Sequence, residues 1–145
     1  MFVERRDAQV QLLTEDAASS ARSGNTTAAI GDLTRVIQMQ PNNYYALNNL
    51  ALILASAPDP SLRNGKQALA LAQQAAKIDD NHHVESYDTL AAAEAENGDF
   101  ADAIIHERQA IDLAQTGNAT SNQAALLDAL NKRLQGYEKN QPYRQ

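Results

Sequence analysis

The chain has 145 residues, enough for one domain or one short repeat array, and its formal net charge of −6 at pH 7 argues against a nucleic-acid partner, since phosphate binding requires clustered lysine and arginine. Cysteine is absent, which excludes disulfides, a thiolate nucleophile and a thiolate metal site, and fits the cytoplasm and the periplasm equally. Only 5% of the residues are aromatic and none is tryptophan, so we expect a core of small and aliphatic side chains in closely packed helices.

The first two helices are predicted from apolar side chains that recur three or four residues apart and so share one helical face. The first helix is expected over about residues 5–23, with inward positions Val10, Leu13, Ala17 and Ala21. Gly24 can adopt the left-handed conformation that closes a helix, and Asn25 or Thr26 can cap the next one. That second helix is expected over about residues 27–40, with inward positions Ala29, Ile30, Leu33, Val36 and Ile37.

The third and fourth helices form a second pair with an insertion between them. The third is expected over about residues 43–56, with Leu47, Leu50, Ala51 and Leu54 on one face. The interval between matching positions is nine residues in the other two pairs and fourteen in this one. The extra residues include two prolines that forbid a continuous helix, which predicts a surface loop over residues 57–65. The fourth helix, over about residues 66–78, is rich in alanine.

A third helix pair and a final helix complete the chain. The pair is expected over about residues 84–97 and 100–115, with inward positions Tyr87, Leu90, Ala91, Ala95, Ala103, Ile104, Ala110 and Ile111. The final helix, over about residues 119–138, has an apolar face of Leu126, Leu127, Leu130 and Leu134. Its opposite, polar face is predicted to carry Asp128, Lys132, Arg133 and Gln135. We expect this helix to cap the array and the tail, residues 139–145, to be frayed or to lie along the cap.

The three helix pairs repeat one pattern with a period of about 34 residues, which is typical of a helix-turn-helix solenoid. The repeats cover about residues 10–43, 44–82 and 84–116, with glycine or proline between helices. This pattern resembles the tetratricopeptide repeat family. The stretch from Asn48 to Gly65, and the ending Pro142-Tyr143-Arg144, are similar to a variant found in bacterial proteins. The resemblance implies a single all-α domain: a right-handed α-solenoid of three repeats plus a C-terminal capping helix.

In this family the first helix of each repeat lines a concave groove that holds a peptide. By position in the repeat, the resemblance implies these groove residues: Gln11, Thr14, Glu15, Ala18, Tyr45, Asn48, Asn49, Leu52, Glu85, Asp88, Thr89 and Ala92. The side-chain amide of Asn49 can bond a peptide backbone as donor and acceptor together, and Tyr45 offers a rigid contact with a polar tip. The alternative is that these side chains are solvated residues of a tolerant helix face.

One use of this fold is a clamp of lysine, asparagine and arginine around a chaperone's terminal carboxylate. At the five clamp positions this chain has Thr14, Ala18, Asn49, Glu85 and Thr89, of which only Asn49 agrees. Acidic side chains along the groove would repel a carboxylate. We therefore expect a neutral or basic protein or peptide partner.

Candidate catalytic and metal residues are few. His106-Glu107 begins like a zinc-protease signature, but Ala110 stands where the second histidine is required. His82 and His83 are adjacent, so their side chains diverge, and a loop pair is favoured over a metal site. We expect no metal, no cofactor and no catalytic residues.

The favoured function is a non-enzymatic protein-interaction module. The alternatives are an accessory C-terminal domain of a longer bacterial enzyme or membrane protein, and a self-associating scaffold that forms a homo-oligomer. The sequence has no signal peptide and no stretch of about eighteen apolar residues, so we expect a soluble chain, cytoplasmic or periplasmic, without direct membrane insertion.

Overall fold

The structure, a computed structural model, describes residues 2–80, 82–116 and 121–145. Within these ranges the backbone forms seven α-helices and no strand. The helices are α1 (Phe2–Arg22), α2 (Thr26–Met39), α3 (Tyr44–Ser56), α4 (Gly65–Asp79), α5 (Val84–Glu96), α6 (Phe100–Gln115) and α7 (Ser121–Glu138). The predicted all-helical fold is confirmed. Residues 119 and 120, expected at the start of the capping helix, lie outside the described residues.

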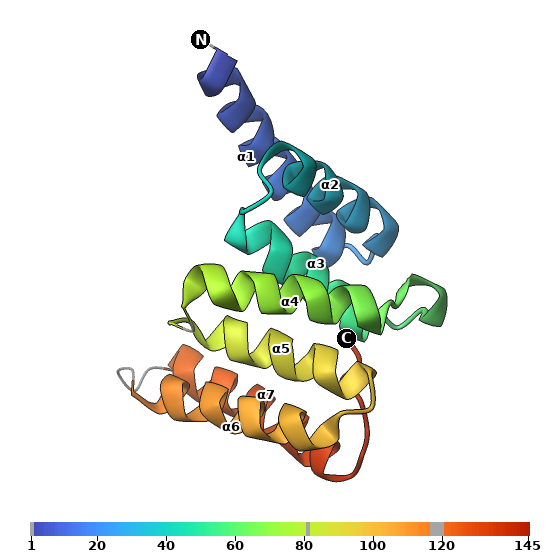
Figure 1. Cartoon of the computed structure of the whole chain (residues 1–145), viewed down its shortest axis with the longest axis vertical. Helices are drawn as coiled ribbons and strands as arrows, with labels where there is room; N and C mark the ends of the chain where they lie inside the picture. Colours follow the sequence, from blue (N-terminus) through green and yellow to red (C-terminus); the bar gives the residue numbers. More distant parts are fainter. Residues whose placement is uncertain (1, 81, 117–120) are drawn as a thin grey trace.

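The helices pack in sequential pairs. α1 packs on α2, α3 on α4 and α5 on α6, while α7 packs on α6. Figure 1 shows the pairs stacked along the long axis of the molecule, with the first turns of α1 projecting from one end. None of the described helices combines the length and apolar character that crossing a membrane requires.

Small side chains allow this close packing. Helical alanines with no exposed surface come from five different helices, and they are Ala29, Ala51, Ala68, Ala75, Ala91, Ala93, Ala103 and Ala110. Larger aliphatic side chains, such as Leu47 and Val36, fill the space between them and are also fully buried. The core is therefore made of aliphatic contacts between adjacent helices, as the low aromatic content predicts.

Asparagine and aspartate side chains begin the helices. Asn25 accepts a hydrogen bond from the Ala28 amide at the start of α2, and Asn43 and Asn64 cap α3 and α4 in the same way. Asp99 caps α6 through the Asp102 amide. Each cap satisfies an amide that has no partner within its helix. The turns before α2 and α6 also contain glycine in the left-handed region, with φ +80° at Gly24 and +83° at Gly98.

Gly98→Ala is expected to destabilise the protein by about 1 kcal/mol, because an alanine Cβ is unfavourable at this positive φ. A Cβ at this position would meet nothing within 4 Å, so the cost is conformational. Gly31→Ala is the matched control: Gly31 lies inside α2, also with open space around it, and alanine should stabilise that helix by about 0.5–1 kcal/mol. Urea unfolding of the two variants checks the opposite signs. Equal shifts would contradict the assignment of Gly98 to a turn.

The insertion between α3 and α4 forms a loop with one short 3₁₀ turn, η1 (Pro60–Leu62). Asp59 caps this turn by accepting from the Ser61 amide at 2.9 Å and the Ser61 hydroxyl at 2.8 Å. Arg63 then fixes the loop to the next repeat, because its Nη1 donates to the Ala57 carbonyl at 2.8 Å and its Nε pairs with Glu96 at 3.2 Å. The exposed loop is thus held at its base by the end of α5.

The sequence left two possibilities for the tail, frayed or lying along the cap, and the structure shows it held against the rest of the fold. Asn140 takes a left-handed conformation with φ +55°, and the Gln141 amide donates to the Gly136 carbonyl at 2.9 Å, which closes α7. The chain then turns back across the molecule, and the Gln145 amide donates to the Ser56 carbonyl at 2.9 Å. Figure 1 shows this last stretch running from α7 to the end of α3. Contacts with three helices therefore hold the tail in place.

Candidate binding groove

The structure divides the predicted groove residues into two groups. Four of them line one cavity of about 290 Å³ between α1 and α3, and these are Thr14, Ala18, Asn49 and Leu52. Four others are buried, at 8% exposure or less, and these are Asn48, Asp88, Thr89 and Ala92. The remaining four, Gln11, Glu15, Tyr45 and Glu85, are exposed.

The cavity between α1 and α3 has a largely apolar wall. Besides the predicted residues it is lined by side chains that were not assigned to the groove, namely Ala17, Ala21, Arg22, Leu33, Ile53 and Gln145. Thr14 and Asn49 supply polar groups. The Thr14 hydroxyl donates to the Val10 carbonyl at 2.8 Å, whereas the Asn49 amide forms no hydrogen bond with any residue that the structure describes. The site thus offers an apolar recess with one available amide beside it.

Three of the exposed groove residues, Gln11, Glu15 and Tyr45, lie on α1 and α3, the helices of this cavity, and the fourth, Glu85, lies on α5. On α1, Gln11 donates to Glu15 at 3.1 Å, one helical turn away. On α3, Tyr45 is 66% exposed and its ring packs edge-on against Tyr44, with 5.3 Å between centroids. Glu15 and Glu85 are exposed and carry negative charge.

Hydrogen bonds connect α3 with the start of α5. The Tyr44 hydroxyl and the Ser86 hydroxyl are 2.9 Å apart, and Ser86 donates to Asp79 at 2.7 Å. The His83 amide donates to the same carboxylate at 2.9 Å. Burial opposes ionisation of Asp79, but the hydrogen bonds from Ser86 and His83 outweigh it and hold its pKa at about 2. The network fixes how the second and third repeats sit against each other.

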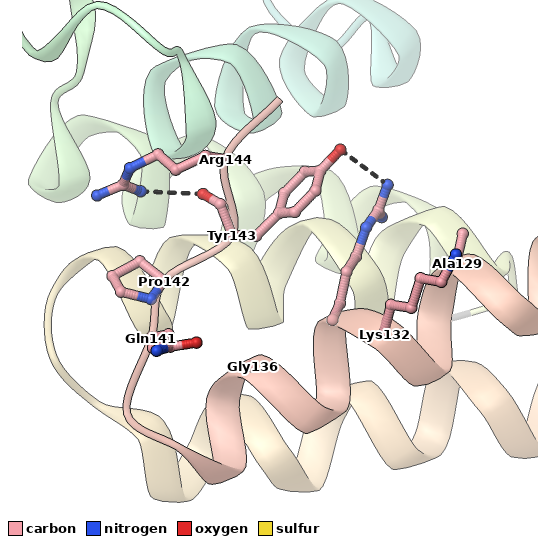
Figure 2. A pocket seen from close by; sticks show the side chains of 8 residues that line it. Ala129, Lys132, Gly136, Gln141, Pro142, Tyr143 and Arg144 are labelled. Atoms are coloured by element: carbon pink, nitrogen blue, oxygen red, sulfur yellow. Dashed lines mark hydrogen bonds between the residues drawn. The ribbon is translucent and has the colours of Figure 1, made fainter.

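The α5 part of the predicted groove is covered. Asp88 forms an ion pair with Arg133 of α7, and the Arg133 guanidinium lies 4.1 Å from the ring centroid of Tyr143. The Arg133 side chain also donates to the Tyr143 hydroxyl at 3.2 Å, as Figure 2 shows. Tyr143 packs against the apolar cluster that contains Ala92. Asp88 and Ala92, with Thr89 on the same helix, therefore do not line an open groove, contrary to the sequence prediction.

Asn48 is the fourth correction. It is 5% exposed, because α3 packs against α2, α4 and α5 and nearly every side chain after Tyr45 is enclosed. Its neighbour Asn49 is exposed and lines the cavity between α1 and α3. Of the two adjacent asparagines, only Asn49 is available for a ligand.

A buried polar cluster lies behind Asp88. Glu107 of α6 and Tyr137 of α7 are both fully buried, and neither Glu107 carboxyl oxygen nor the Tyr137 hydroxyl has a hydrogen-bond partner among the described residues. Burial, reinforced by the neighbouring Asp88, raises the pKa of Glu107 to about 10, so this carboxyl is neutral at pH 7. The sequence pattern did not single out this cluster, although Glu107 lies four residues from both Ala103 and Ile111 on the inner face of α6.

His83 and His106 pair with the carboxylates of Asp79 and Glu94, whereas His82 contacts a backbone carbonyl. His106 Nδ1 lies 2.8 Å from Glu94 Oε2, and its ring stacks on Tyr87 with 6.3 Å between centroids. His82 Nδ1 lies 2.8 Å from the Asp79 carbonyl. Across the described ranges, no three histidine, aspartate or glutamate side chains converge in a group able to hold a metal ion.

Comparison with known proteins gives the fold but no sequence relative. No protein-family model and no curated protein matches the chain. Among solved structures, the Thermobaculum terrenum O-GlcNAc transferase mutant is similar with a TM-score of 0.70 at 22% identity, over 87% of this chain but 22% of the transferase chain. The Arabidopsis OM64 TPR domain matches with a TM-score of 0.65 at 17% identity, over 88% of this chain and 98% of that domain.

A third similar structure contains a ligand. The first TPR of Spaghetti (RPAP3), solved bound to the HSP90 peptide SRMEEVD, has a TM-score of 0.64 at 16% identity, over 88% of this chain and 94% of that one. Together with the three helix pairs and the capping helix, these similarities define the class. The chain has the fold of a tetratricopeptide-repeat (TPR) domain.

Proposed function

We propose that this chain is a non-enzymatic interaction module that binds a peptide or protein segment on its concave face, between α1 and α3. The observation that carries the proposal is the cavity of about 290 Å³ in which Thr14, Ala18, Asn49 and Leu52 meet. Four of the twelve residues that repeat position assigned to the groove thus share one recess. The structure of the Spaghetti TPR with its peptide supports this use of the fold.

The chemistry of the recess suggests what it accepts. Its apolar wall suits an aliphatic side chain of the partner, and the Asn49 amide can bond the partner's backbone as donor and acceptor. Glu15 is exposed on the same helix as Thr14 and Ala18, which favours a neutral or basic segment. We propose no cofactor and no catalytic role for these residues.

A second candidate is an accessory domain of a longer protein. The observation that favours it is the similarity to the transferase chain, of which this chain spans 22%. In that case the groove would serve the same binding role next to another activity. A homo-oligomeric scaffold is the third candidate, and sedimentation would reveal it as a dimer.

Ala18→Leu is expected to weaken a bound peptide at least about tenfold, because the larger side chain fills the recess from α1. Ala8→Leu is the matched control, since Ala8 is exposed on the same helix outside the cavity lining. Both changes preserve helix propensity closely. Peptides selected from a displayed random library on the unmodified chain supply the ligand, and fluorescence anisotropy measures its dissociation constant. Equal affinities for the two variants would refute binding in this cavity.

A further inference from the structure

The C-terminal segment, residues 141–145, runs back from α7 past α5 to α3. It leaves α7 after Asn140, crosses α5 and reaches α3, where the Gln145 amide donates to the Ser56 carbonyl at 2.9 Å. Gln145 also lines the cavity between α1 and α3. The end of the segment therefore borders the cavity in which we propose that a peptide binds.

Two adjacent side chains anchor the segment. Figure 2 shows the Tyr143 ring and the Arg144 guanidinium pointing to opposite sides of the backbone, as expected for an extended chain. The ring lies beneath Arg133 and packs against two apolar clusters of the core. Arg144 Nη1 pairs with Glu96 Oε2 at 2.6 Å. The receiving surface under the segment, formed by α5 and the end of α3, thus contacts an aromatic residue on one side of the segment and a cation on the other.

The receiving surface does not depend on this segment for its charge balance. Glu96 keeps a second partner, Arg63, at 3.2 Å, and Asp88 keeps Arg133. The Arg144 side chain is 35% exposed, and such partly exposed ion pairs contribute little to stability. A cavity of about 300 Å³ separates the segment from α7 between Lys132, Gly136 and Tyr143, so the segment is not fully packed on that side. The segment can therefore leave this surface without stranding a buried charge.

We propose that the inner face of α5 and the end of α3 form a binding surface for an extended peptide in which an aromatic residue is followed directly by arginine, and that residues 141–145 occupy this surface until such a partner displaces them. The inference rests on the proposed function, because both treat the concave face as the binding surface. The inference adds the chemistry of a partner. It also adds a form of regulation, because displacement of Gln145 opens the cavity between α1 and α3.

The test uses the 145-residue chain and a fluorescent peptide with the sequence Asn-Gln-Pro-Tyr-Arg-Gln as the probe. In the unmodified chain the attached segment competes at an effective concentration in the millimolar range. The double variant Tyr143→Ala, Arg144→Ala removes this competition, so it should bind the probe at least about tenfold more tightly than the unmodified chain does. A probe with alanine in place of tyrosine should bind neither protein.

The outcomes separate the inference from its rivals. Equal or absent probe binding in a double variant that keeps the helical circular dichroism and cooperative unfolding of the parent would overturn it. If that variant does not fold, Arg144→Glu, which leaves the Tyr143 ring in place, is compared with the parent in the same way and decides the question. A dimer of the parent that dissociates on adding the probe would instead assign the surface to a second copy of the chain. If Ala18→Leu leaves the affinity for library peptides unchanged while the probe still binds, this result would refute peptide binding in the cavity between α1 and α3. The inference about the surface on α5 and α3 would stand.

Discussion

Arg133→Met is expected to lower the free energy of unfolding by about 3 kcal/mol, the cost typical of removing one partner from a buried ion pair. The change leaves the Asp88 carboxylate, 8% exposed, without its cation. Methionine keeps most of the aliphatic volume of the arginine stem, so lost packing is a minor part of the effect. The Tyr143 ring also loses the guanidinium that lies 4.1 Å from its centroid. Urea unfolding followed by circular dichroism measures the change.

The neighbouring residue on α7 supplies the control. Lys132 pairs with Asp128 one turn earlier at 3.0 Å, and its side chain is 74% exposed. Lys132→Met should therefore change the free energy of unfolding by no more than about 0.5 kcal/mol. Adding Asp88→Asn to Arg133→Met removes the stranded charge and should recover much of the loss. Equal effects of the two methionine variants would show that the Arg133 pair is not buried in solution.

The helices could be predicted because their signals are local. The spacing of apolar residues, the glycine turns and the asparagine caps each act within a few residues, and α3 ends at the predicted Ser56. The repeat pattern then places the helices relative to one another. Gly24 and Gly98 both have the positive φ that their turns require. Local chemistry therefore determines most of this fold.

Repeat position alone does not decide which of the groove residues are open. Thr14 and Asn49 line the cavity between α1 and α3, whereas Asn48 and Thr89, at equally expected positions, are buried. Asp88 was assigned to an open groove and Arg133 to the polar face of the cap, yet the two pair with each other over 45 residues of sequence. Arg133 lies three residues after Leu130 and four before Tyr137, both fully buried, so it borders the apolar face of α7. That spacing indicates that Arg133 is buried. The identity of its partner, Asp88, depends on the tertiary fold.

Glu107→Gln is expected to make the protein more stable at neutral and alkaline pH. Burial and the neighbouring Asp88 raise the pKa of Glu107 from an ordinary value of 4.5 to about 10 in the folded protein. The folded state therefore holds this proton more tightly than the unfolded chain does. The stability that depends on the protonated carboxyl is complete below pH 4.5 and is lost as the pH rises toward 10. Glutamine keeps the size and neutrality of the protonated side chain at every pH.

The measurement is the difference in free energy of unfolding between Glu107→Gln and the parent, taken from urea unfolding between about pH 5 and pH 8. One proton gives a limiting slope of about 1.4 kcal/mol per pH unit, so the variant should gain up to about 4 kcal/mol on the parent across this range. Glu138→Gln, at the exposed end of α7, is the control and should give no such slope. The groups that face Glu107 are Asp88, Arg133 and Tyr137. A flat difference for Glu107→Gln would mean that Glu107 is ionised in the folded protein, and that the cluster behind the covered groove admits water.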